Sequence, residues 1–175
     1  MPYVPDGSKP YYLRLRINLL SGFGYRYKGI YKTIDVLSTT TLEELHRIIF
    51  FLFERYDEHM WEFHFGASSP MSRSGLHICS DGEMEADWLD GMGDEEEERK
   101  DCRLFTLEAL HIAPRQHFFY IFDYGDMWEH KIVVSSYQEV KEADPDTFRL
   151  VKSVGQVPPQ YPDFDDEDDE DEDEE

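Results

Sequence analysis

The stretch Tyr-Tyr-Leu-Arg-Leu-Arg-Ile-Asn-Leu-Leu, residues 11–20, carries the clearest structural signal in this chain. Its odd-numbered positions hold apolar side chains, whereas the even-numbered positions include the polar residues Arg14, Arg16 and Asn18. Successive side chains of a β-strand point to opposite faces of a sheet, so this alternation is typical of a strand with one buried face. We therefore expect a half-buried strand over residues 11–20.

The same two-residue period returns in other parts of the chain. After the turn Ser-Gly-Phe-Gly, a second β segment is expected at residues 25–36, and it forms an antiparallel pair with the first. The further strands predicted from the pattern span residues 60–66, 76–79, 118–122, 128–137 and 147–154. The turn Asp-Tyr-Gly-Asp joins residues 118–122 and 128–137 into a hairpin.

One segment changes to a helical period. Thr41 and Glu44 form a capping box, and apolar residues then recur every three or four positions. The spacing predicts a helix over residues 41–56. A short second helix is expected near residues 106–110.

Together these elements predict an α+β fold. It consists of an antiparallel or mixed sheet of hairpins, one major helix at about 41–56 packed on a face, and the short second helix. The 12 Phe, 11 Tyr and 3 Trp provide enough apolar surface for a core. We expect residues 1–162 to form a single α+β domain with an acidic surface loop at about 81–101, followed by a disordered acidic tail at 163–175.

The acidity of the chain is confined to two segments. Its formal net charge is −22, from 39 acidic side chains and 17 lysines and arginines. Residues 81–98 hold ten acids and residues 163–175 hold twelve, so the remaining 17 acids equal the 17 basic residues. Salt adaptation spreads acidity over a whole surface and does not fit this pattern. The two runs either solvate the protein or mimic nucleic acid and occupy a basic groove.

The cysteines and the distribution of apolar residues indicate the cellular compartment of the protein. Cys79 and Cys102 fit neither a zinc ribbon nor a disulfide framework, and we interpret them as ordinary thiols. The first residues lack the features of a signal peptide, and no apolar run approaches the roughly 18 residues of a membrane span. These observations favour a cytoplasmic protein without a membrane partner.

Residues 120–130, Tyr-Ile-Phe-Asp-Tyr-Gly-Asp-Met-Trp-Glu-His, concentrate polar groups within an apolar hairpin. The two-residue period places Asp126, Trp128 and His130 on one face. An acid, an indole and an imidazole side by side are typical of a site that binds a ligand or positions a proton. The candidate binding site therefore consists of Asp123, Gly125, Asp126, Trp128 and His130.

No cofactor is predicted beyond a divalent metal, for which Asp123, Asp126 and His130 are the candidate ligands. Further ligands have to come from elsewhere, and His59, His64 and His117 are available. The structural alternative is that the aspartates cap the turn, the indole fills the core and His130 pairs with a carboxylate.

Two motifs give the chain a family resemblance. Residues 41–46 read T-L-x-E-L-H, and residues 120–130 read Y-x-F/Y-D-F/Y-G-D-x-W-x-H. In both the chain resembles the plasmid pRiA4b ORF-3-like family of bacteria and archaea, over roughly residues 10–160. The resemblance implies an α+β fold, a mobile-element association suggested by the names of some members, and no established biochemical function. Many members continue P-P-E-D-x-G-G where this chain has Pro158-Pro159-Gln160, so a role of that segment does not carry over.

Several enzyme classes are excluded by missing motifs. Neither G-x-x-x-x-G-K nor G-x-G-x-x-G occurs, which argues against nucleotide binding of the usual kinds. Ser72-Arg73-Ser74 lies in a Gly/Ser-rich stretch, and nothing downstream indicates a helix-turn-helix, so recombinase activity is not expected.

Three functions stay open. The first is a non-enzymatic module that binds protein or nucleic acid. The second is a nucleic-acid-associated protein that uses the basic aromatic hairpin 9–33. The candidate contacts of that hairpin are Arg14, Arg16, Arg26, Lys28 and Lys32. The third is a metal-dependent hydrolase or nuclease that uses residues 123–130.

Overall fold

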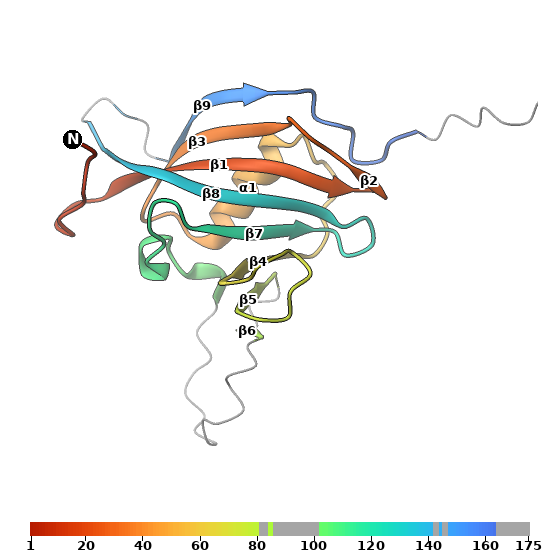
Figure 1. Ribbon diagram of the computed structural model, residues 1–175, viewed down its shortest axis with the longest axis horizontal. Helices are drawn as coiled ribbons and strands as arrows, with labels where there is room; N and C mark the ends of the chain where they lie inside the picture. Colours follow the sequence, from red (N-terminus) through yellow and green to blue (C-terminus); the bar gives the residue numbers. More distant parts are fainter. Residues whose placement is uncertain (81–83, 86–101, 142–143, 145–146, 164–175) are drawn as a thin grey trace, which may run out of the picture.

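One antiparallel sheet of nine strands organises the structure (Figure 1). The computed structural model describes residues 1–80, 84–85, 102–141, 144 and 147–163. The strands are β1 (Tyr11–Gly22), β2 (Tyr25–Arg26), β3 (Tyr31–Leu37), β4 (Trp61–Phe65), β5 (Leu76–Cys79), β6 (Met84–Glu85), β7 (His117–Phe122), β8 (Trp128–Glu139) and β9 (Phe148–Val154). Their order across the sheet is β6-β5-β4-β7-β8-β1-β3-β9, and β2 pairs with the end of β1.

The two twelve-residue strands β1 and β8 form the centre of the sheet. The strand predicted at residues 11–20 is confirmed. The β segment predicted at residues 25–36 is divided into β2 and β3, and both pair antiparallel with β1. The predicted hairpin is also confirmed: β7 and β8 pair, with Phe122 across from Trp128 and Tyr120 across from His130.

Helix α1 (Leu42–Leu52) lies behind the sheet in Figure 1. Its start confirms the predicted capping box: the Glu44 amide donates to Thr41 Oγ1 at 3.2 Å, and the Thr41 amide donates to the Glu44 carboxylate at 2.8 Å. The predicted end at residue 56 is wrong. The helix stops at Leu52 because the backbone of Glu54 enters the left-handed region, with φ at 54°.

The predicted α+β class is wrong as well. Among the described residues α1 is the sole α-helix, with eleven residues beside nine strands, so the fold is dominated by its sheet. The short second helix predicted near residues 106–110 is a three-residue 3-10 turn, η3 (Glu108–Leu110), and another 3-10 turn, η2 (Cys102–Leu104), precedes it. All strand pairings are antiparallel, so the mixed-sheet alternative does not apply. The physical reason is that most apolar surface of the chain follows a two-residue period, which only paired strands can bury on one face.

The main core fills the space between α1 and the sheet. Leu15 and Ile17 of β1 are fully buried there, together with Leu45 of α1. Rings supply much of the packing: Phe63 lies 4.9 Å from Tyr120 between ring centroids. We call the opposite side of the sheet, which points away from α1, the far face.

The acidic loop predicted at 81–101 and the acidic tail predicted at 163–175 lie almost entirely outside the described residues. The domain boundary at residue 162 therefore stays a prediction. No helix of the described part is long and apolar enough to cross a bilayer.

Candidate metal centre

The turn between β7 and β8 is held by Asp123. Its backbone is left-handed, with φ at 61°, and its Oδ1 accepts hydrogen bonds from the amides of Gly125 and Asp126 at 2.9 and 3.3 Å. Its Oδ2 lies 3.5 Å from Nε2 of His59. Burial and the neighbouring Asp123 charge raise the pKa of Asp126. Oδ1 of Asp123 thus caps the turn and fixes the hairpin geometry, while Oδ2 faces His59.

Trp128 and His130 point to the other side of this hairpin, into the core below α1. The Trp128 ring is fully buried, and the guanidinium of Arg55 stacks on it at 3.8 Å from the ring centroid. His130 is 1% exposed and lies against Phe53, with its Nδ1 at 3.1 Å from the carbonyl oxygen of Trp128. The carbonyl accepts from Nδ1–H, so Nε2 of the neutral ring carries the lone pair. The two side chains are structural parts of the core in this geometry, and they lie away from Asp126 in the turn.

Two buried histidines make the stability of the fold sensitive to acid. Burial lowers the pKa of His130 to about 3 and that of His46 to about 4. In the unfolded chain both rings take up a proton near pH 6.5, so the unfolded state binds more protons below that pH.

We therefore expect the free energy of unfolding to fall as the pH drops below about 6.5, by about 1.4 kcal/mol per pH unit for each ring. The loss continues to about pH 4 for His46 and to about pH 3 for His130. Urea unfolding at about pH 7.5 and about pH 5 measures it. Equal stability at the two pH values would contradict neutral burial of these rings.

A second polar cluster lies on the far face, on the hairpin of β4 and β5. The Trp-Glu-Phe-His-Phe sequence of β4 puts its apolar rings toward α1 and Glu62 and His64 on the far face. Strand β5 is paired so that His77 lies across from His64 and Cys79 across from Glu62. The register alone therefore gathers these four side chains.

Glu62, His64 and His77 form the closest part of this group, which we call the far-face cluster. One ligand atom of each lies within 4.8 Å of the others. Glu62 Oε1 contacts His64 Nε2 and lies 3.9 Å from His77 Nδ1, while the two imidazoles stack with centroids 3.9 Å apart. Among the described residues this is the one group of three such side chains close enough to hold a metal ion.

The polar atoms of the far-face cluster are buried and short of partners. The side chain of His64 is 4% exposed, and its Nε2 contacts the Glu62 carboxylate, whereas Nε2 of His77 lacks a hydrogen-bond partner among the described residues. Burial lowers the pKa of His64 to about 4 against the opposing effect of Glu62, so the ring is neutral. A neutral imidazole with a free lone pair is the form that binds a metal.

Glu62 is itself positioned by neighbours. The hydroxyl of Tyr124, in the turn after β7, donates to Glu62 Oε2 at 2.9 Å. Burial, and then this carboxylate, raise the pKa of Tyr124, so the phenol stays a donor. Cys79 Sγ lies 3.6 Å from the same oxygen. The segment 120–130 therefore touches the far-face cluster through Tyr124, a residue that was not among the predicted site residues.

Of the residues proposed from the sequence, only His64 lies in the far-face cluster. It was proposed as a possible further ligand for a metal held by Asp123, Asp126 and His130. His77 and Glu62 were missed. The sequence signal that could have found them is the two motifs Glu-x-His at 62–64 and His-x-Cys at 77–79. In each motif a two-residue spacing puts both polar side chains on one face, and the two strands pair. Asp123, Asp126 and His130 do not bring three ligand atoms together.

The residues predicted to contact nucleic acid do not all lie on one exposed surface. Arg14 and Arg16 lie on the far face, across from Asp35 and Thr33 of β3. Arg26 and Lys28 are exposed near β2. Lys32, by contrast, is 8% exposed, lies across from the core residue Ile17 and donates to Ser153 Oγ at 2.6 Å.

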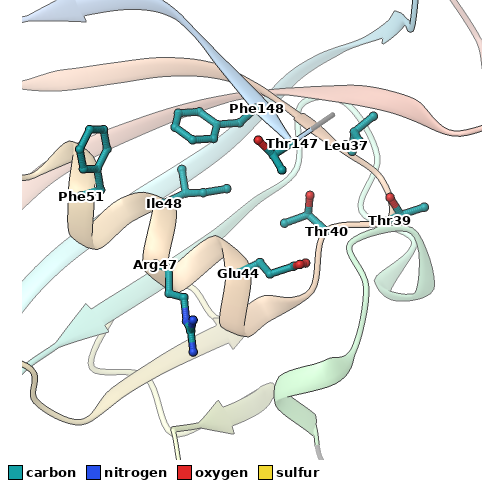
Figure 2. A pocket seen from close by; sticks show the side chains of 9 residues that line it. All are labelled: Leu37, Thr39, Thr40, Glu44, Arg47, Ile48, Phe51, Thr147 and Phe148. Carbon is teal, nitrogen blue, oxygen red and sulfur yellow. The ribbon is translucent and has the colours of Figure 1, made fainter. Parts of the chain in front are cut away.

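A cavity of about 430 Å³ opens between α1 and the start of β9 (Figure 2). Ile48 and Phe51 of α1 face Phe148 across it, and Arg47 stands at its side. Phe51 is 72% exposed. Nothing in the described part of the chain identifies an occupant for this apolar hollow.

Fold and site together define a sheet-dominated protein with a buried group of histidines and a carboxylate on the far face. The family described as plasmid pRiA4b ORF-3-like protein matches residues 12–163, and the chain belongs to this family. A crystal structure of a protein of unknown function from Methanosarcina mazei Go1 is similar, with a TM-score of 0.53 and 20% identity, over 86% of this chain and 72% of the other. At this identity the likeness concerns the fold alone. No curated protein matches the chain.

Proposed function

We propose that this protein is a metal-binding module that holds a divalent transition-metal ion, Zn²⁺ in the first place, at Glu62, His64 and His77. The observation that carries the proposal is a stacked pair of histidines packed against a carboxylate away from solvent, in which Nε2 of His77 lacks a hydrogen-bond partner among the described residues. Two imidazoles and one carboxylate are a ligand set of zinc proteins, whereas Mg²⁺ and Ca²⁺ prefer oxygen ligands alone.

The distances suit a small closure of the site around an ion. Metal–ligand bonds of about 2.0–2.2 Å in a tetrahedron put the ligand atoms roughly 3.4 Å apart. The ligand atoms of the far-face cluster lie within 4.8 Å of one another, so rotamer adjustments of Glu62 and His77 are sufficient. The side chains of these two residues are 16% and 14% exposed, which leaves the ion a path from solvent.

A titration of metal-free protein with Zn²⁺ against a chromophoric chelator tests the proposal. We expect one ion per chain for the wild type and no competitive binding for His77→Ala. The His111→Asn variant is a matched control, because His111 is exposed, lies outside the cluster and has a left-handed backbone that asparagine tolerates. Equal zinc binding by all three proteins, or none by the wild type, refutes the proposal.

A second candidate function, nucleic-acid association, has one specific observation in its favour. Arg16 stacks on Tyr31 at 3.8 Å, and Lys152 of β9 lies 5.9 Å from the same ring, on the far face that also carries the metal cluster. Exposed cations grouped around an aromatic ring suit a single-stranded phosphate backbone.

A fluorescent single-stranded oligonucleotide tests this second candidate. Binding is expected to weaken steeply with salt, to be lost in the double variant Arg16→Ala/Lys152→Ala, and to tighten when residues 163–175 are deleted, because those twelve acids compete for the same cations. Binding that does not depend on salt rejects a phosphate-backbone mode.

A further inference from the structure

We infer that the thiolate of Cys79 is the fourth ligand of the metal at Glu62, His64 and His77, which makes the site selective for thiophilic ions. The inference rests on the proposed function and adds a ligand to it. It starts from register: Cys79 lies two residues after His77 and directly across from Glu62, so its side chain is on the far face with the cluster.

Glu62 connects the thiol to the histidines. Its Oε1 faces the rings of His64 and His77, and its Oε2 lies 3.6 Å from Cys79 Sγ. The carboxylate therefore stands between the sulfur and the imidazoles. Cys79 Sγ lies outside the group of ligand atoms within 4.8 Å of one another, so the side chains of both Glu62 and Cys79 have to rotate to bring the four groups around one point. Cys79 is 8% exposed and is not in a disulfide, so its thiol is shielded from solvent.

Binding through sulfur requires the loss of one proton. In the metal-free site the Cys79 thiol donates to Glu62 Oε2. When the metal–sulfur bond forms, the S–H bond breaks, and the proton passes to that carboxylate oxygen and from there to water, since Glu62 is partly exposed. One proton is thus released for each ion bound.

The chemistry of the resulting site differs from that of a three-ligand site. Thiolate ligands favour Zn²⁺, Co²⁺ and Cd²⁺ over Mg²⁺ and Mn²⁺. A fourth protein ligand also closes the tetrahedron, which is the arrangement of structural metal sites, whereas three protein ligands leave a position for water and substrate. The inference therefore favours a metal that stabilises the β4–β5 hairpin over one that performs hydrolysis.

The test is the absorption spectrum of the full chain loaded with Co²⁺. We expect a sulfur-to-cobalt charge-transfer band in the near ultraviolet beside the visible d–d bands of a tetrahedral ion. Cys79→Ser should lose the charge-transfer band, keep weaker Co²⁺ binding and bind Cd²⁺ at least about tenfold less tightly. Cys102→Ser is the matched control and should retain the band.

The outcomes separate the inference from the proposed function. Co²⁺ binding without a sulfur band in the wild type, or a band that survives in Cys79→Ser, overturns the thiolate ligand and leaves the metal site standing. No Co²⁺ binding at all overturns both. If Cys79→Ser fails to fold, alkylation of the wild type with iodoacetamide decides: metal should slow the modification of Cys79 at least about tenfold, and an unchanged rate rejects the inference.

Discussion

Zinc ions are expected to raise the thermal unfolding midpoint of this protein by about 5–10 °C at a free concentration near 100 times the Kd. A ligand that binds only the folded state adds about 2.7 kcal/mol under those conditions, and a domain of this size gains roughly 2–4 °C per kcal/mol. The gain should vanish in His64→Ala, because this variant removes the most buried ligand of the far-face cluster. Calorimetry with and without Zn²⁺ measures both shifts.

The control for this prediction is again His111→Asn, which should keep the full shift. The metal-free His64→Ala protein should unfold at a lower midpoint than the wild type, because deletion of a buried ring stacked on His77 leaves a cavity. The zinc-induced shift is therefore measured within each variant. A zinc-induced shift of the same size in His64→Ala and in the wild type would place the ion elsewhere.

Replacement of Trp128 by alanine is expected to destabilise the fold by about 3–5 kcal/mol, the usual cost of deleting a fully buried large ring. The ring is 0% exposed, Arg55 stacks on it, and Gly22 of β1 approaches it so closely that a Cβ atom there would lie 2.0 Å from Trp128 Cε3. Gly22 has no side chain that could fill the space left by the ring. Urea unfolding of wild type and Trp128→Ala gives the difference.

An exposed aromatic residue provides the comparison for Trp128. Phe51 on α1 is 72% exposed, and Phe51→Ala should cost less than about 1 kcal/mol. Similar losses in the two variants would argue against Trp128 as a core residue. If Trp128→Ala folds and still binds zinc normally, Trp128 does not contribute to the metal site.

Local patterns predicted the strands well and the helix in part. The alternation at residues 11–20 and the capping box at Thr41 each depend on neighbours in sequence, and both are present in the structure. The end of α1 coincides with the left-handed backbone of Glu54, and the next residue, Arg55, stacks on the distant Trp128. Apolar periodicity runs through this break, so the sequence alone predicted a helix that is four residues too long.

The candidate site depended on register in the same way. Asp123 and His130 are close in sequence, yet the turn uses the aspartate and the core buries the histidine. Glu62 and His77 are distant in sequence and meet only because β4 and β5 pair with His64 across from His77. Two-residue spacing within one strand shows which side chains share a face, but the partner strand has to be known before a ligand set can be assembled.

The central claim, a metal ion at Glu62, His64 and His77, is tested most directly by anomalous diffraction at the zinc absorption edge from crystals grown with Zn²⁺. The account predicts one strong peak per chain about 2.0–2.2 Å from a carboxylate oxygen of Glu62 and from a ring nitrogen of each histidine. Density that shows the three side chains without a peak between them, at saturating zinc, would contradict it.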